Sequence, residues 1–250
     1  MSAVVPFTGL ACGALLAAAG LALWGENRQD TSTLDRMRAT VRVIRWVAGA
    51  LLIVGALLAW EGRSNLSGAA PHLILMAALA APPEIHRHRL ARWARVLPIL
   101  PAVGLAGAGL IWALGTAEAS AGSGPITPSQ LALTICGGLA ARALGMAAGT
   151  FGIAEGDVAG STPHLEWPPT AAYGLLTLIV GGTLLANLWQ RGWAWDGTAS
   201  ERSLAGVWLA WTAAWTTPRR SRRLRAAFII VAALLLIVLA AGYSMIEVHS

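Results

Sequence analysis

Long apolar runs recur along this chain and constrain its fold more than any other feature. Runs close to 20 residues, such as 4–24 and 226–246, have the length that an α-helix needs to cross the hydrocarbon layer of a membrane. Only 12% of the residues are charged, whereas a soluble domain carries about 25%. Lipid admits only helices and closed barrels, and the strict alternation of apolar and polar residues expected of barrel strands is absent. We therefore predict an all-α, polytopic transmembrane helix bundle that forms one integral membrane domain over residues 1–250.

Eight membrane spans are expected. Their predicted bounds are about 4–24, 43–60, 66–82, 97–116, 129–152, 170–189, 203–217 and 226–246. Pro71, Pro82 and Pro83 bracket the third span, since proline interrupts a helix interior. No basic residue precedes the first apolar run, so we expect a retained first span instead of a cleaved signal peptide.

The distribution of arginine predicts which side of the membrane each loop faces. All 18 basic residues are arginines, and most fall in three segments between apolar runs. These residues are Arg28, Arg36 and Arg38, with Arg42 and Arg45 at the start of the second span, then Arg87, Arg89, Arg92 and Arg95, and finally Arg219, Arg220, Arg222, Arg223 and Arg225. An excess of arginine is typical of cytoplasmic loops. Both termini and the loop between spans six and seven are therefore predicted to face outward from a bacterial plasma membrane.

Two further features of the composition narrow the possibilities. The isoelectric point of about 10.9 could suggest a nucleic-acid partner. The placement of the arginines in membrane-flanking loops explains this charge instead, so no nucleic-acid partner is predicted. Cys12 and Cys136 both lie within apolar runs, so neither indicates a secreted disulfide framework.

Residues 186–215 contain six of the 12 tryptophans in the chain. Trp189, Trp193 and Trp195 fall within seven residues, and three more follow at helical spacing, namely Trp208, Trp211 and Trp215. Tryptophan commonly lies at the membrane interface, which explains the six single tryptophans elsewhere. A cluster of indoles also suits a large, flat, apolar ligand such as haem. The residues alone do not decide between an interfacial belt and a platform for a ligand.

The cluster resembles the tryptophan-rich "WWD" signature of the haem-handling proteins of cytochrome c maturation, in particular the CcsA/ResC type. That signature reads roughly G-x7-W-G-x-Y-W-x-W-D-P-K-E-T-W. The chain matches it without gaps at Gly181, Trp189, Trp193, Trp195 and Asp196. An arginine-rich loop and a last span ending in GYSMIEVHS follow, as a basic loop and a terminal helix do in that family. The resemblance covers about residues 128–250, which would form the haem-handling core.

The resemblance implies a cofactor, partners and iron ligands. Proteins of this family hold haem at an external loop, and histidines on either side of the signature ligate its iron. His249 matches the second external ligand position, and a neutral imidazole is a good ligand for haem iron. The implied partners are apocytochrome c and a second cytochrome-c-assembly membrane protein that carries a large external domain. The protein would then be a component of a cytochrome c haem lyase.

Several positions depart from the family pattern. Gly197, Thr198 and Ala199 replace its Pro-Lys-Glu, and Thr216 stands near its histidine that follows the signature. Cys136 occupies the place of its first external histidine. Cysteine thiolate can bind haem iron, but a buried cysteine more often only packs.

Other histidines and one arginine are further candidates. His72 lies near the outer end of the third predicted span and would either replace a missing ligand or sit at the interface as an ordinary residue. His86, His88 and His164 fall in loops predicted to be cytoplasmic, which makes them poor partners for an external haem. Arg142 lies at membrane depth, where it would pair with a haem propionate or with Glu155, or form a structural ion pair.

Three functions are compatible with these observations. The first is a haem-handling protein that holds haem at the external tryptophan loop for attachment to apocytochrome c. The second is a non-catalytic CcsA/HemX-like relative that acts as a subunit, or as an assembly or regulatory factor, of a haem or respiratory complex. The third is a transporter or channel unrelated to haem, which we rank last because Arg142 is the only charge deep within a predicted span.

Overall fold

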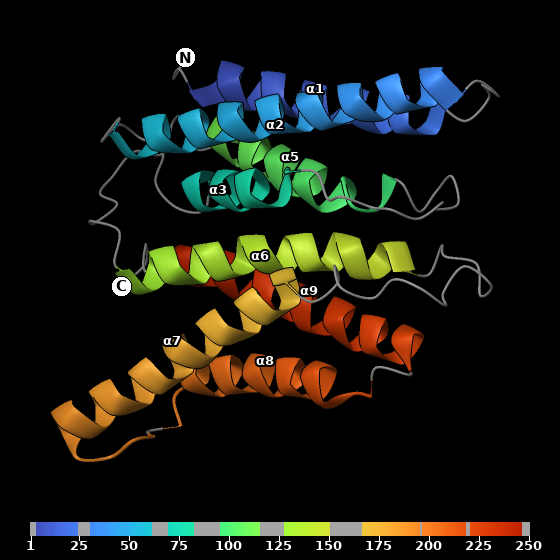
Figure 1. The fold of residues 1–250 in the computed structure, drawn as a ribbon. Helices are drawn as coiled ribbons and strands as arrows, with labels where there is room; N and C mark the ends of the chain where they lie inside the picture. Colours follow the sequence, from blue (N-terminus) through green and yellow to red (C-terminus); the bar gives the residue numbers. More distant parts are fainter. Residues whose placement is uncertain are drawn as a thin grey trace.

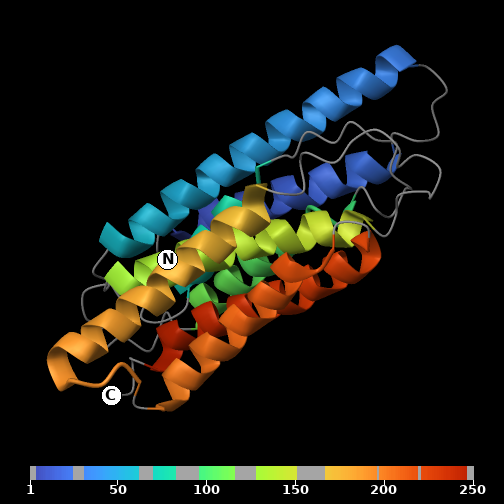
Figure 2. The ribbon, with the colours of Figure 1, turned by 60° about the horizontal axis from the view of Figure 1, so that its bottom comes forward.

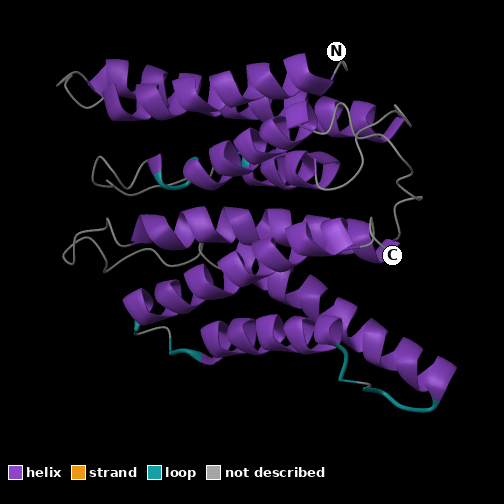
Figure 3. Cartoon of the chain, turned by 180° about the vertical axis from the view of Figure 1, so that it is seen from behind, coloured by secondary structure: helices purple, strands orange, loops and turns teal. Residues whose placement is uncertain are grey.

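A computed structural model of the chain describes residues 4–24, 31–61, 70–82, 96–115, 128–150, 167–195, 197–218 and 221–246. These residues form helices and no strand, as Figure 3 shows, which confirms the all-α prediction. The helices are α1 (Val4–Trp24), α2 (Thr31–Glu61), α3 (Ala70–Ala80), α5 (Leu100–Gly115), α6 (Pro128–Thr150), α7 (Trp167–Arg191), α8 (Ala199–Thr216) and α9 (Arg222–Ile246).

Each predicted span corresponds to a helix, but α2 and α3 differ from the prediction in length. Helix α2 begins at Thr31, well before the predicted start at residue 43, because its first turns contain neither proline nor glycine and continue as a polar helix. Arg45 therefore lies inside this helix and not at its start. Helix α3 has only 11 residues and ends ahead of Pro82 and Pro83. At about 1.5 Å per residue, it is much shorter than the hydrocarbon layer.

Five segments are long and apolar enough to cross a membrane. They are α1, α6, residues 35–59 of α2, residues 168–191 of α7 and residues 223–242 of α9. Large apolar side chains such as Ile111, Leu178 and Val238 are exposed on the outside of the bundle, as expected of surfaces that face lipid instead of water. These features indicate a multi-pass membrane protein. The number of spans and the side that each loop faces stay predictions.

The helices form two halves around α6. Figure 1 shows α1, α2, α3 and α5 on one side of α6, and α7, α8 and α9 on the other. Each half has its own apolar core, and most of the buried side chains are alanine. Helix α7 departs from this packing: little of it is buried, and it diverges from the bundle toward its C-terminal end (Figures 1 and 2).

Successive helices run in opposite directions, so the helix ends gather at two opposite ends of the bundle. Figure 1 shows the start of α1, the connection between α7 and α8, and the end of α9 at one end. The starts of α2 and α9, which carry Arg36, Arg38 and Arg223, lie at the other. Arg191 and Arg202 lie at the same end as the tryptophan-rich connection, so arginine is not confined to one end of the bundle.

Glycines on α6 allow close contact with the first half of the bundle. A Cβ atom at Gly145 would lie 2.8 Å from Cα of Pro98, and one at Gly138 would lie 2.7 Å from Cβ of Leu79. Real Cβ atoms do not approach other atoms so closely, so each position requires glycine. The backbone of α6 therefore lies directly against the residues that end α3 and precede α5.

We expect Gly145→Ala to destabilise the bundle by about 1–3 kcal/mol, because the added methyl group meets the backbone of Pro98, which cannot rotate away. Gly174→Ala on α7 is the control: nothing lies within 4 Å of its Cβ position, and alanine favours helix over glycine. Thermal unfolding in mild detergent should place Gly145→Ala below the wild type and Gly174→Ala at or above it. A Gly145→Ala protein as stable as the wild type would contradict this packing.

Candidate functional site

The last turn of α7 and the connection to α8 carry three predicted site tryptophans, and the connection is built from local backbone features. Helix α7 ends at Arg191, and Gly192 follows with φ +75°, a conformation that glycine adopts without strain. Its N–H donates to the carbonyl of Leu188 at 3.1 Å, which satisfies one of the carbonyls left open at a helix end. The chain therefore leaves α7 in a defined direction.

The start of α8 is fixed by a capping box. The N–H of Glu201 donates to the Thr198 hydroxyl at 3.3 Å, and the N–H of Thr198 donates to the Glu201 carboxylate at 3.1 Å. Together these bonds satisfy two backbone donors at the helix start. Gly197 precedes the box with φ +67°. Gly197 and Thr198 thus serve as the turn glycine and the N-cap of α8.

Glu201 also ties the two helices together. Its side chain is 7% exposed, and its carboxylate accepts a further hydrogen bond from the side-chain amide of Asn187 on α7. A carboxylate in the first turn of a helix is favoured by the helix dipole. This residue was not among the predicted site residues, although the Thr-x-x-Glu spacing of a capping box is readable from the sequence. Hydrogen bonds therefore fix the connection where α7 ends, where α8 begins and between the two helices.

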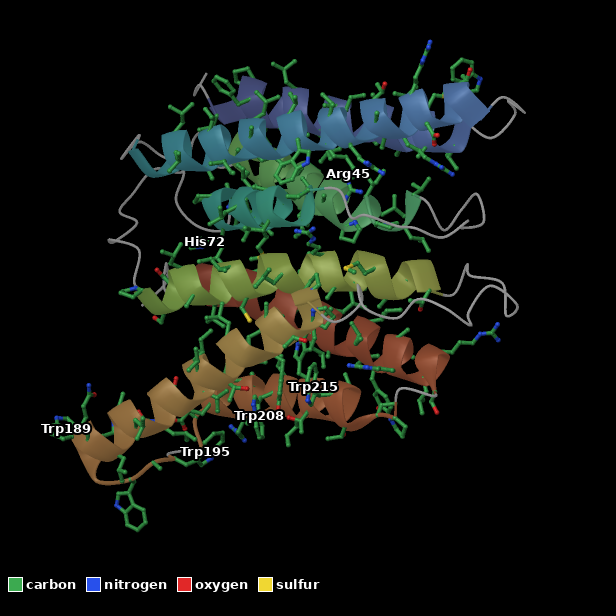
Figure 4. All side chains as sticks on the ribbon, viewed as in Figure 1. Arg45, His72, Trp189, Trp195, Trp208 and Trp215 are labelled. Atoms are coloured by element: carbon green, nitrogen blue, oxygen red, sulfur yellow. The ribbon has the colours of Figure 1, made fainter. Side chains whose placement is uncertain are left out.

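The three indoles at the end of α7 and on the connection are exposed. Trp189 is 92% exposed, Trp193 74% and Trp195 43%. Figure 4 shows Trp189 at the end of α7 and Trp195 beside the start of α8. Exposed indoles on a fixed loop can insert into the interfacial layer of a membrane or cover a flat apolar ligand. Asp196, the remaining residue of the Trp-x-Trp-Asp match, lies outside the described residues.

The tryptophans of α8 do not extend this surface. Trp208 faces α7 and donates its indole N–H to the Thr177 hydroxyl at 3.1 Å. Trp211 is buried in the core of the second half, and its indole N–H has no partner among the described residues. Trp215 stacks on Tyr173 near the far end of α8, with ring centroids 5.9 Å apart. The six indoles therefore do not form the single slab that their spacing allows.

His72 lies in the interface between α3 and α6, apart from the tryptophan connection. Its side chain is 5% exposed, and Nδ1 lies 2.6 Å from the Thr134 hydroxyl oxygen. That hydroxyl donates to the carbonyl of Gln130 at 2.8 Å, so Nδ1 is the donor to Thr134 and Nε2 carries the lone pair. Figure 4 places His72 between α3 and α6, away from Trp189 and Trp195. The fold does not bring this histidine to the indoles.

Cys136 is fully buried, and its thiol donates to the carbonyl of Ala172 on α7 at 3.2 Å. It packs within the core of the second half, away from the exposed indoles. This position fits the interpretation of Cys136 as a packing residue.

The terminal candidate ligand, His249, lies outside the described residues, as do His86, His88, His164 and Glu155. Helix α9 ends at Ile246, at the same end of the bundle as the α7–α8 connection (Figures 1 and 2). Arg142 is partly buried on α6. Within the described ranges, no three His, Cys, Asp or Glu side chains come together to hold a metal ion.

Arg45 was not among the predicted site residues either. It was placed at the start of the second span, but its side chain is only 5% exposed and lies among α2, α3 and the residues before α5. Nε donates to the carbonyl of Ala81 at 2.8 Å and Nη2 to that of Pro82 at 3.0 Å. Arg45 therefore supplies donors to carbonyls that follow the end of α3 (Figure 4).

Comparisons with known proteins identify no family for this chain. It matches no protein-family model, no curated protein and no solved structure.

Proposed function

We propose that this protein is a haem-handling membrane protein of cytochrome c maturation, which holds haem at the connection between α7 and α8 for attachment to apocytochrome c. The single observation that carries the proposal is the exposure of Trp189 at the end of α7 and of Trp193 and Trp195 on the loop that follows, which the Glu201 contacts fix. A rigid apolar surface binds a flat ligand without first being ordered, which reduces the entropic cost of binding.

The residues of this connection fit the chemistry of haem. Indole faces complement the apolar porphyrin ring. Haem supplies an iron that binds imidazole, and His249 would hold that iron, because it follows the end of α9 by three residues and α9 ends at the same end of the bundle as the connection. Asp196, Trp193 and Trp195 would shape the site. In this proposal the connection faces outward from a bacterial plasma membrane, and a second assembly protein supplies the large external domain.

A test is the absorption spectrum of the protein purified in mild detergent. We expect a Soret band that is lost in His249→Ala and weakened in a Trp193→Ala/Trp195→Ala double variant. His72→Ala is the control: its imidazole is buried between α3 and α6, so the band should persist. Loss of the band in His72→Ala but not in His249→Ala would contradict the proposed ligand.

A second function is favoured by the exposure of α7. Little of this apolar helix is buried by its own bundle, and Leu178, Leu185 and Leu188 are exposed along it. A non-catalytic relative could use this surface as a subunit, or as an assembly or regulatory factor, of a haem or respiratory complex. Colourless protein that still purifies with such a complex would support this function over haem handling.

A further inference from the structure

Helix α2 is longer than a membrane requires. Its 31 residues span about 46 Å, whereas the hydrocarbon layer is about 30 Å thick. Its charged residues, Glu61 apart, fall at residues 35–45, and residues 46–60 are uncharged. Figure 2 shows the first turns of α2 standing clear of the other helices. The start of the helix therefore lies at the level of the lipid headgroups.

The side chains of α2 separate into two faces. One face is buried against the rest of the bundle, at Arg45, Ala48, Leu52 and Ala56. The other face is exposed. Side chains four residues apart form a row on it that runs from the start of the helix toward its middle. This row consists of Arg38, Arg42, Trp46, Ala50 and Val54. Side chains four residues apart are neighbours on a helix surface, so the row is continuous.

Along this row the side chains change from charged to aromatic to apolar. A phospholipid changes in the same order, from its phosphate to the headgroup boundary to its acyl chains. Two guanidinium groups come first, one exposed indole follows a turn later, and apolar side chains complete the row. Guanidinium binds phosphate oxygens with charge and paired hydrogen bonds. Indole prefers the boundary between headgroup and acyl chain, and the apolar part suits an acyl chain. We propose that this face of α2 binds an anionic phospholipid, with its phosphate at Arg38 and Arg42 and an acyl chain along Trp46 and Val54.

Asp35 modulates this site. Its carboxylate lies 3.2 Å from Nη1 of Arg38, and both side chains are largely exposed. Exposed ion pairs of this kind contribute little to stability, so the pair opens easily. It nevertheless competes with a phosphate for Arg38. Removal of the carboxylate should therefore strengthen lipid binding, an effect that damage to the fold would not produce.

The test is native mass spectrometry of the full chain with phosphatidylglycerol or phosphatidylcholine of the same acyl composition. We expect the wild type to retain phosphatidylglycerol in preference to phosphatidylcholine. Arg42→Gln should lower this preference about fivefold, the usual contribution of one arginine near an anionic surface. Asp35→Asn should raise it. Arg202→Gln, which removes an exposed arginine from α8 at the opposite end, should leave it unchanged.

Three results would overturn the proposal. They are equal retention of both lipids by the wild type, an Arg42→Gln protein that keeps the full preference, and an Arg202→Gln protein that loses as much as Arg42→Gln. The last result would show that net charge, and not this face of α2, selects the lipid.

Discussion

Replacement of Arg45 by methionine should destabilise the bundle by about 3 kcal/mol, the largest effect expected of any single substitution considered for this chain. Methionine retains much of the apolar volume but donates no hydrogen bond. The carbonyls of Ala81 and Pro82 would lose the donors at 2.8 and 3.0 Å that they now have. A buried carbonyl without a donor costs about 1–3 kcal/mol, and here two are affected.

The position of these carbonyls explains why no neighbouring backbone group can replace the lost hydrogen bonds. Ala81 and Pro82 directly follow α3, so their carbonyls have no partner within the helix and lie at the negative end of its dipole. Pro82 and Pro83 follow α3 and have no N–H to offer. A cation from another helix is therefore the natural partner. Nη2 of Arg45 also lies 3.5 Å from the carbonyl of Pro98, so one side chain connects α2, the end of α3 and the start of α5.

The measurement is unfolding in mixed detergent micelles, monitored by circular dichroism. Arg42→Met is the matched control, because Arg42 lies on the same helix but is exposed, and its replacement should leave stability within about 0.5 kcal/mol of the wild type. Arg45→Lys should fall between them, since an ammonium group is a point charge that cannot reproduce the fork of a guanidinium. Equal stability of Arg45→Met and Arg42→Met would refute the role of this contact.

Arg45 also shows where prediction from the sequence ends. Hydropathy locates the helices to within a few residues at α1 and α9, because each apolar run is long and flanked by polar residues. The same method treats an arginine near a span as a sign of the membrane surface. The burial of Arg45 depends on the carbonyls of Ala81 and Pro82, which are distant in sequence and have no signature in it.

The tryptophans give a similar lesson at the candidate site. Spacing places Trp208, Trp211 and Trp215 on neighbouring turns of a helix, but it cannot say which side of that helix packs. Because α9 covers one side of α8, Trp211 is buried, whereas Trp208 and Trp215 turn to α7. Trp215 stays 42% exposed beside α7, and the most exposed indoles of residues 186–215 are Trp189 and Trp193. The capping box at Thr198 and Glu201, by contrast, is local and could have been predicted.

Glu201→Ala should have the second largest effect, and it should be concentrated at the connection between α7 and α8. The substitution leaves the amide of Asn187 and the N–H of Thr198 without their acceptor and removes a carboxylate from the first turn of α8. We expect a loss of about 2–3 kcal/mol in the stability of this connection. Glu201→Gln should be less destabilising than Glu201→Ala, because one oxygen remains to accept a hydrogen bond. It should still lower stability, because the new amide NH2 group would face another donor.

Hydrogen exchange distinguishes this local effect from a general one. In Glu201→Ala the amides of residues 192–202 should exchange at least about tenfold faster, while those of α6 keep the wild-type rate. Ser203→Ala is the control, since among the described residues its exposed hydroxyl bonds only to the carbonyl of Ala199 within the same helix. If haem binds at the connection, its affinity should fall in Glu201→Ala, because Trp193 and Trp195 would then lose the orientation that makes them a surface. Unchanged exchange at residues 192–202 would mean that Glu201 does not hold the indoles in place.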